Sequence, residues 1–215
     1  MECFKRGITT IDEPFYKSEI FIVAINTKDN YLATVANLIS SIPPTSTILL
    51  MSSISVYREF SSSVDEHSVI TKQSLQKDVE DLVLANIKNS VVLRLGGLMG
   101  EDRVAGRWSS AKSFEDGYVN YVHRDDVVNI IKKLIQDNIK SGVFNIVAPL
   151  HPTRKEVHKL NAARFGVKLG EFNGFSHRVV LSDKIQDELG YEFIYKNPLE
   201  FWSSYDYTLT DDIVE

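Results

Sequence analysis

Short apolar segments alternate with amphipathic helical segments through the first half of the 215-residue chain, and this order constrains the fold most. Residues Ile20–Ile25, Thr47–Met51 and Val91–Leu95 are short apolar runs rich in β-branched residues. Such runs are typical of strands that are buried on both faces of a sheet. Apolar residues at helical spacing fill the intervals over Asn30–Ser41 and Lys72–Ala85. The alternation predicts an α/β fold in which helices cover a parallel sheet.

The second half of the chain predicts a smaller and more mixed set of elements. Asp125–Gln136 has the apolar spacing of an amphipathic helix, and Val143–Val147 is typical of a strand. A helix is predicted over Thr153–Phe165, because it begins with the Thr-x-x-Glu pattern of a capping box. Residues Glu101–Asp116 are polar and contain glycine, so we expect a mobile loop there.

Composition excludes several classes of function. The formal net charge of -5 and the pI near 5.6 argue against a nucleic-acid partner, since such proteins concentrate Lys and Arg. No apolar run approaches the roughly 20 residues that span a bilayer, so we expect no membrane partner. A single cysteine, Cys3, rules out an internal disulfide and a cysteine-based zinc cage. These features predict a cytoplasmic protein.

Five short segments carry motifs that are weak singly and specific as an ordered set. Ser-Ser-x-x-Val-Tyr follows the second predicted strand, a glycine-containing turn follows the third, and His-Arg-Asp-Asp begins a predicted helix. The segments are Leu49–Tyr57, Val92–Gly100, Tyr121–Val128, Gly142–Val147 and Leu181–Tyr191. In this order they resemble the NAD(P)-dependent epimerase/dehydratase family, which comprises extended and atypical short-chain dehydrogenases. The resemblance covers roughly residues 20 to 200, although Arg58 stands where the family usually has glycine.

The resemblance implies an incomplete Rossmann-like parallel sheet with a small C-terminal substrate lobe. Residues 1–105 would form the partial Rossmann-like domain, and residues 106–215 the lobe, interwoven with the sheet. By the family pattern, the strand at Ile20–Ile25 is about the fourth, so the opening strands have no counterpart here. The Gly-x-Gly-x-x-Gly motif that holds a dinucleotide pyrophosphate at a helix N-terminus is also missing from the 215 residues.

The catalytic residues of this family are only partly matched. By the Ser-Ser-x-x-Val-Tyr match, Ser53 takes the position of the serine whose hydroxyl hydrogen-bonds the reacting oxygen. The family's Tyr-x-x-x-Lys pair is absent, and such a lysine lowers the tyrosine pKa for proton exchange. Anchoring the match on Glu80 places Lys72 at the tyrosine position and Gln76 at the lysine position. A shifted match places Lys72 at the lysine position with Ser68 as the tyrosine counterpart, so we expect Lys72 as the proton partner.

Cofactor and substrate residues follow from the same resemblance. It implies NAD or NADP as cofactor and a nucleotide sugar or another small molecule as substrate. The residues expected at the cofactor are Ala24, Ile25, Asn26, Gly96, Gly97 and Leu98. Those expected at the substrate are Arg103, Arg107 and His123, with Arg103 and Arg107 meeting a phosphate.

Each of these residues also has a structural interpretation, which the sequence leaves open. Ser53 at a strand end is a common turn residue, and Asp125 is a suitable helix N-cap. The glycines at 96, 97 and 100 fit a tight turn, because glycine tolerates positive φ, although a cofactor or another strand could also approach their backbone closely. Arg103 and Arg107 can be solvated loop charges, and His123 can be a hydrogen-bonded orienting residue.

Three functions remain open at this point. In the first, the chain is a split NAD(P)-dependent epimerase, dehydratase or reductase whose nucleotide-binding half comes from a second chain. In the second, it is a non-enzymatic binding or oligomerisation module, and it forms a homodimer through the helix at Lys72–Ala85. In the third, it is a truncated product without a role of its own. The sequence shows no metal-binding constellation, so a metal-dependent function is not among them.

Overall fold

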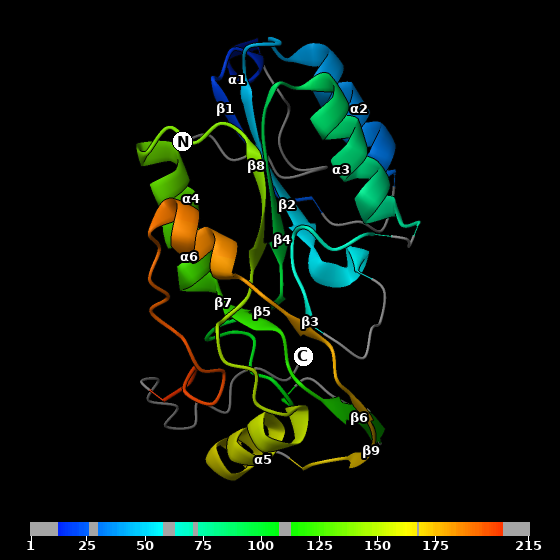
Figure 1. Cartoon of the computed structure of the whole chain (residues 1–215), viewed down its shortest axis with the longest axis vertical. Coiled ribbons are helices and arrows are strands. Elements are labelled where there is room, and N and C mark those ends of the chain that lie inside the picture. Colours follow the sequence, from blue (N-terminus) through cyan, green and yellow to red (C-terminus); the bar gives the residue numbers. More distant parts are fainter. Residues whose placement is uncertain are drawn as a thin grey trace. The chain divides into compact units, whose positions relative to one another are not determined.

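The chain forms two compact units that interleave along the sequence (Figure 1). The first contains residues 1–58, 69–94 and 134–144, and the second contains residues 59–68, 95–133 and 145–215. The sequence predicted a partial Rossmann-like domain over residues 1–105 and a lobe interwoven with the sheet over residues 106–215, and this division stays a prediction. The computed structural model describes residues 13–25, 30–57, 63–70, 73–107, 113–166 and 168–203.

A four-stranded sheet has the strand order β1-β2-β4-β8. The strands are β1 (Ile20–Val23), β2 (Thr47–Ser53), β4 (Asn89–Leu95) and β8 (Gly142–Ile146). All four were predicted, with ends that differ by up to two residues. β1 and β2 pair in parallel. The predicted α/β fold with parallel strands is therefore confirmed.

The two faces of β1 differ in burial. Phe21 and Val23 are 4% and 3% exposed, whereas Ile20 and Ile22 are 39% and 42% exposed. The prediction that this strand is buried on both faces was wrong, since the side chains on one face of β1, the outermost strand of the described sheet, remain partly exposed.

Helices α2 (Tyr31–Ser41) and α3 (Leu75–Asn86) pack against each other along the sheet (Figure 1). They share one hydrophobic core with the inward side chains of β1 and β2. The core includes Phe21, Val23, Val35, Ile48, Leu50, Val79, Val83 and Val92. The helix predicted from residue 72 begins at Leu75, because the Ser74 side chain accepts a hydrogen bond from the Lys77 N–H and caps it.

The second unit contains three two-stranded parallel pairs, β3 with β10, β5 with β7, and β6 with β9. Their bounds are Ser63–Val64 and Val179–Val180, Gly97–Met99 and Tyr121–His123, and Ser113–Gly117 and Glu171–Ser176. The predicted loop at Glu101–Asp116 therefore ends in a strand, β6. The remaining short elements of the chain are α1 (Glu13–Tyr16), the 3-10 helix η1 (Ile54–Val56) and α6 (Asp183–Leu189).

Two predicted helices of the second half are present, as α4 (Arg124–Gln136) and α5 (Arg154–Phe165). The predicted capping box is confirmed, since Thr153 and Glu156 exchange side-chain-to-backbone hydrogen bonds. Asp125 lies in the first turn of α4, so it is not the N-cap.

A buried carboxylate fastens the C-terminal segment of the second unit. Asp126 is fully buried and accepts hydrogen bonds from the Tyr191 hydroxyl at 2.7 Å and from the backbone N–H of Ile194 and Tyr195 at 2.8 and 3.1 Å. Burial, and then the hydrogen bond to Asp126, raises the pKa of Tyr191. Trp202 donates from its indole N–H to the Gly100 carbonyl at 2.9 Å.

The β6–β9 pairing requires glycine at position 117. Its φ is 146°, and a Cβ there would lie 2.4 Å from the Ser176 carbonyl oxygen. Gly174 also has positive φ, 65°, but a Cβ there would meet only Glu115 Cγ at 3.9 Å. We expect Gly174→Ala to cost about 1 kcal/mol and Gly117→Ala more than about 3 kcal/mol, because backbone must also move. Urea unfolding of the two variants checks this, and equal losses would contradict it.

Candidate functional site

The carboxyl ends of β1 and β2 form one edge of the sheet, where open α/β sheets bind ligands. β2 ends at Ser53, and β1 is followed by Ala24 and Ile25. Ser53 is half-buried, and its Oγ accepts a hydrogen bond from the Ser55 N–H at 3.1 Å. Ser53 therefore caps η1, which is the structural role that sequence left open.

A buried ion pair lies directly behind this edge. Arg94 Nη2 lies 2.8 Å from Glu80 Oε2, and Arg94 Nε lies 3.1 Å from Glu80 Oε1. The Ser52 hydroxyl donates to Glu80 Oε1 at 2.6 Å, and Arg94 Nη1 donates to the Tyr57 hydroxyl at 2.9 Å. The Glu80 and Arg94 side chains are 0% and 6% exposed. The network thus joins α3 and β4 to the end of β2 and the residue after η1.

The burial around this pair also keeps the nearby Tyr31 hydroxyl neutral. Burial, assisted by the negative charge of Glu80, raises the pKa of Tyr31 to about 12. Sequence reasoning used Glu80 only to align the family motif and missed its pairing with Arg94. The available signal was Arg94 itself, because an arginine within the apolar run Val91–Leu95 needs a buried partner.

The glycines after β4 allow close contact between strands. Gly96 donates its N–H to Ile146 at 3.0 Å, and Gly97 donates to Asn120 at 2.8 Å. A Cβ on Gly96 would lie 2.5 Å from the Asn120 carbonyl oxygen, and one on Gly97 would lie 2.7 Å from the Tyr121 ring. Neither glycine has positive φ, nor does Gly100, so the interpretation as a positive-φ turn was wrong, and the alternative of a closely approaching strand is the one that the structure supports. The requirement is close approach of another strand.

Of the predicted substrate residues, two are exposed and one is buried. The side chains of Arg103 and Arg107 are exposed on the turn that follows Gly100. His123 is fully buried, and its ring stacks on Tyr195 with centroids 3.7 Å apart. Burial lowers the pKa of His123, so its imidazole is neutral at pH 7.

A second buried histidine lies beneath the same turn. A Cβ on Gly106 would lie 3.3 Å from the His158 ring, and Asn161 Nδ2 donates to the Ala105 carbonyl at 2.9 Å. His158 Nδ1 and Asn161 Oδ1 are buried and have no hydrogen-bond partner in the described part of the chain. Burial, and then the charge of Arg154, lowers the pKa of His158 to about 4.

Metal-ligand clusters and membrane-spanning helices are both absent from the described part of the chain. Among them, no three His, Cys, Asp or Glu side chains gather as a metal site would require. None of the helices described is long and apolar enough to cross a bilayer.

Comparison with curated proteins gives relatives of similar sequence from two strains of Escherichia coli. No family model matches the chain. Protein YeeZ of Escherichia coli K12 is 32% identical over 164 residues, which are 71% of this chain and 60% of that protein. The chain therefore spans about 60% of the length of the curated relative that it matches.

Solved structures match the fold more completely. A protein of unknown function from Silicibacter pomeroyi superposes with a TM-score of 0.76 at 16% identity, over 94% of this chain and 81% of that one. A Methylobacillus flagellatus protein, provisionally assigned as an NAD-dependent epimerase/dehydratase, gives 0.71 at 19% identity, over 86% and 74%. The chain has the epimerase/dehydratase fold. Other structures with this fold, 14% to 16% identical, contain NADPH or NAD.

The epimerase/dehydratase fold brings some predicted site residues together. Ser53, Ala24 and Ile25 lie at the carboxyl ends of neighbouring parallel strands in one unit. Asn26 and Lys72 lie outside the described residues. The roles of these residues, and those of Gly96, Gly97, Leu98, Arg103, Arg107 and His123, stay predictions.

The buried pair predicts a large stability difference between neighbouring carboxylates of α3. Glu80→Gln leaves the Arg94 charge buried without its counter-charge, which costs about 3–5 kcal/mol. Asp81 pairs with Lys77, but its side chain is 60% exposed. We therefore expect Asp81→Asn to cost under about 0.5 kcal/mol. Urea unfolding at pH 7 measures both, and a Glu80→Gln variant as stable as Asp81→Asn would contradict this account.

His158 predicts a dependence of stability on pH. Its pKa is 6.5 ordinarily and about 4 in the folded chain, so between these values the unfolded chain binds more protons. The contribution of the neutral His158 to the free energy of unfolding is therefore complete above pH 6.5 and decreases as the pH falls towards 4. We expect His158→Phe to reduce the loss of unfolding free energy between pH 7 and 4.5 by about 2 kcal/mol. The exposed His67→Gln is the control, and parallel pH curves for His158→Phe and the parent would refute the assignment.

Proposed function

We propose that the chain carries the substrate lobe and part of the nicotinamide side of an NAD(P)-dependent epimerase, dehydratase or reductase. Its substrate would be a nucleotide sugar or another small molecule. The observation that supports this most is the position of Ser53, at the end of β2 and beside the end of the parallel strand β1. Ligands in this class of sheet bind at that edge. We also propose a cytoplasmic location.

The described residues fit the nicotinamide end of a dinucleotide better than its pyrophosphate. The edge formed by Ala24, Ile25 and Ser53 is partly open and offers backbone groups and a hydroxyl. In contrast, the N–H groups of Gly96 and Gly97 already donate to backbone carbonyls, so they offer no cradle for a pyrophosphate. A nicotinamide group would supply hydride transfer, and its diphosphate would have to be held by a segment outside these residues.

The proposed role of Ser53 follows from its hydrogen bonding. Its Oγ accepts from the Ser55 N–H, which orients the hydroxyl at the strand end. The O–H group can then donate to the reacting oxygen of a substrate, as the family resemblance implies. Lys72 is the proposed proton partner. Gln76, in the first turn of α3, cannot exchange a proton at neutral pH.

A second candidate function is a non-enzymatic module that forms a homodimer through α3. The observation that favours it is the exposure of Leu75 and Leu84 on this helix, which are 38% and 41% exposed. The absence of a Tyr-x-x-x-Lys pair also agrees with it. Such a module would bind no nicotinamide nucleotide, so nucleotide binding separates the two functions.

The test uses a fusion of this chain to the part of Protein YeeZ that lies outside the matched residues. We expect NADPH or NADH at 100 times its dissociation constant to stabilise the fusion by about 2.7 kcal/mol. Thermal unfolding with and without nucleotide measures this, with ATP as the control ligand. A folded fusion that shows no shift with either nucleotide would contradict the proposed enzyme. A dimer that dissociates on Leu84→Lys would then favour the module.

A further inference from the structure

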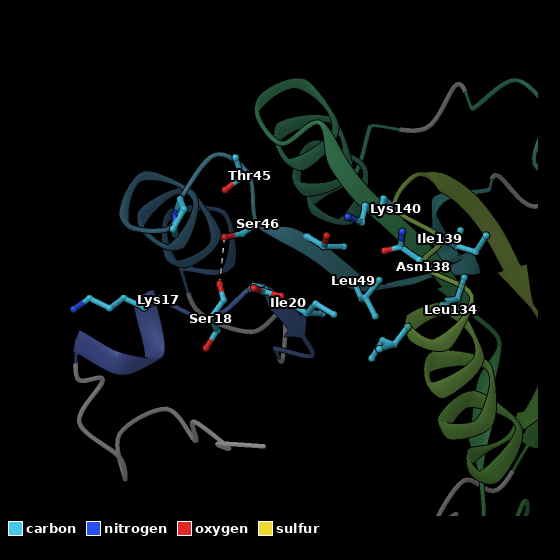
Figure 2. Close-up of a pocket in the computed structure, with 14 residues that line it drawn as sticks. Lys17, Ser18, Ile20, Thr45, Ser46, Leu49, Leu134, Asn138, Ile139 and Lys140 are labelled. Carbon is cyan, nitrogen blue, oxygen red and sulfur yellow. Dashed lines mark hydrogen bonds between the residues drawn. The ribbon is translucent and has the colours of Figure 1, made fainter.

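Two surface features do not belong to the candidate site, a hollow in the first unit and a bulge between β6 and β9 in the second. The hollow has a volume of about 390 Å³ and is bordered by the starts of β1 and β2 and by the segment after Leu134 (Figure 2). In the described part of the chain, the polar atoms that are buried without a hydrogen-bond partner belong to α5, and neither lines this hollow. The hollow therefore gives no indication of a specific ligand, whereas the bulge brings reactive groups together.

The bulge lies in β9, beside its partner strand β6 (Figure 1). The register joins Glu115 to Asn173 and then Gly117 to Ser176, so β9 has two residues between these pairings where β6 has one. Gly174 is the first of the two, and its φ of 65° is the left-handed conformation typical of glycine at a bulge. The extra residue interrupts the hydrogen-bonded ladder directly after Asn173.

Asn173 is the only asparagine in the sequence that is followed by glycine. Its side chain is exposed, and its Nδ2 donates to the Ser113 hydroxyl at 2.9 Å. Because Gly174 has no Cβ to shield its backbone nitrogen, this nitrogen can reach the Cγ of the asparagine before it. A regular ladder would hold the two atoms apart, and the bulge relaxes that constraint. The two groups of an intramolecular attack are thus adjacent, exposed and free to approach.

We propose that Asn173 is a site of spontaneous deamidation in the folded protein. The backbone nitrogen of Gly174 loses its proton to hydroxide and attacks Asn173 Cγ, which closes a five-membered succinimide ring. The bond between Cγ and Nδ2 breaks, and Nδ2 takes up a proton from water and leaves as ammonia. Water then opens the ring at either imide carbonyl, which leaves an aspartate or an isoaspartate at position 173. The reaction consumes one water and releases one ammonia without a cofactor, so it does not depend on the proposed function.

Either product weakens the β6–β9 pair. The charge of an aspartate lies opposite Glu115, and like charges directly opposite each other destabilise paired strands. The aspartate also loses the N–H that donates to Ser113. An isoaspartate lengthens the backbone of β9 just before Gly117 approaches Ser176, where a Cβ on the glycine would lie 2.4 Å from the Ser176 carbonyl oxygen. This close contact leaves no room for the extra length, so we expect the two strands to separate after residue 173.

The test is incubation of the purified chain at pH 8 without denaturant, followed by peptide mapping with mass spectrometry. The peptide that contains Asn173 should gain the mass difference between an amide and a carboxylic acid, and an isoaspartate-specific methyltransferase should label it. Asn138 is also exposed but is followed by Ile139. It should react at least about tenfold more slowly, because a β-branched side chain crowds the attacking nitrogen. The rate at Asn173 should rise with pH, since the nitrogen must be deprotonated.

Gly174→Ala provides the matched variant and should slow the reaction at Asn173 at least about tenfold, because its Cβ shields the nitrogen. Three outcomes would overturn the site. These are equal rates at Asn173 and Asn138, an unchanged rate in folded Gly174→Ala, and deamidation of Asn173 that occurs only in urea.

Urea unfolding tests the consequence for the β6–β9 pair. Asn173→Asp installs one product directly and should unfold at a lower urea concentration than Asn173→Gln, which keeps a neutral amide. Adding Glu115→Gln to Asn173→Asp should restore most of the lost urea midpoint, because it removes the opposing charge. Equal midpoints for Asn173→Asp and Asn173→Gln would refute the weakening of the pair.

Discussion

The Glu80–Arg94 ion pair is the interaction on which the candidate site depends. It connects α3 to β4, and through Ser52 and Tyr57 it also holds the end of β2 and the turn that follows. Two buried charges are costly to desolvate, and they are tolerated here because Arg94 and Ser52 satisfy the carboxylate from two strands. Ser53 follows Ser52 directly, so its position at the strand end is fixed by contacts that lie behind the site rather than within it.

The sequence predicted the elements of this fold well and their surroundings less well. The apolar runs at residues 47 and 91 became β2 and β4, and the capping box at Thr153 is present as expected. The run at Ile20 has the same composition, yet one of its faces is partly exposed, because the burial of a face depends on which helices and side chains pack over it. Composition indicates that a segment can be buried, whereas only the tertiary arrangement decides on how many faces.

Site residues were harder to predict because their partners are distant in sequence. Ser52 and Glu80 are 28 residues apart, and Asp126 contacts Tyr191 across 65 residues. Local motifs gave Ser53 a catalytic interpretation and Asp125 a capping one. The structure shows Ser53 capping η1 and Asp125 inside α4. A residue that belongs to a buried polar network, such as Arg94, can be recognised in the sequence only because a charged residue is unusual within an apolar run.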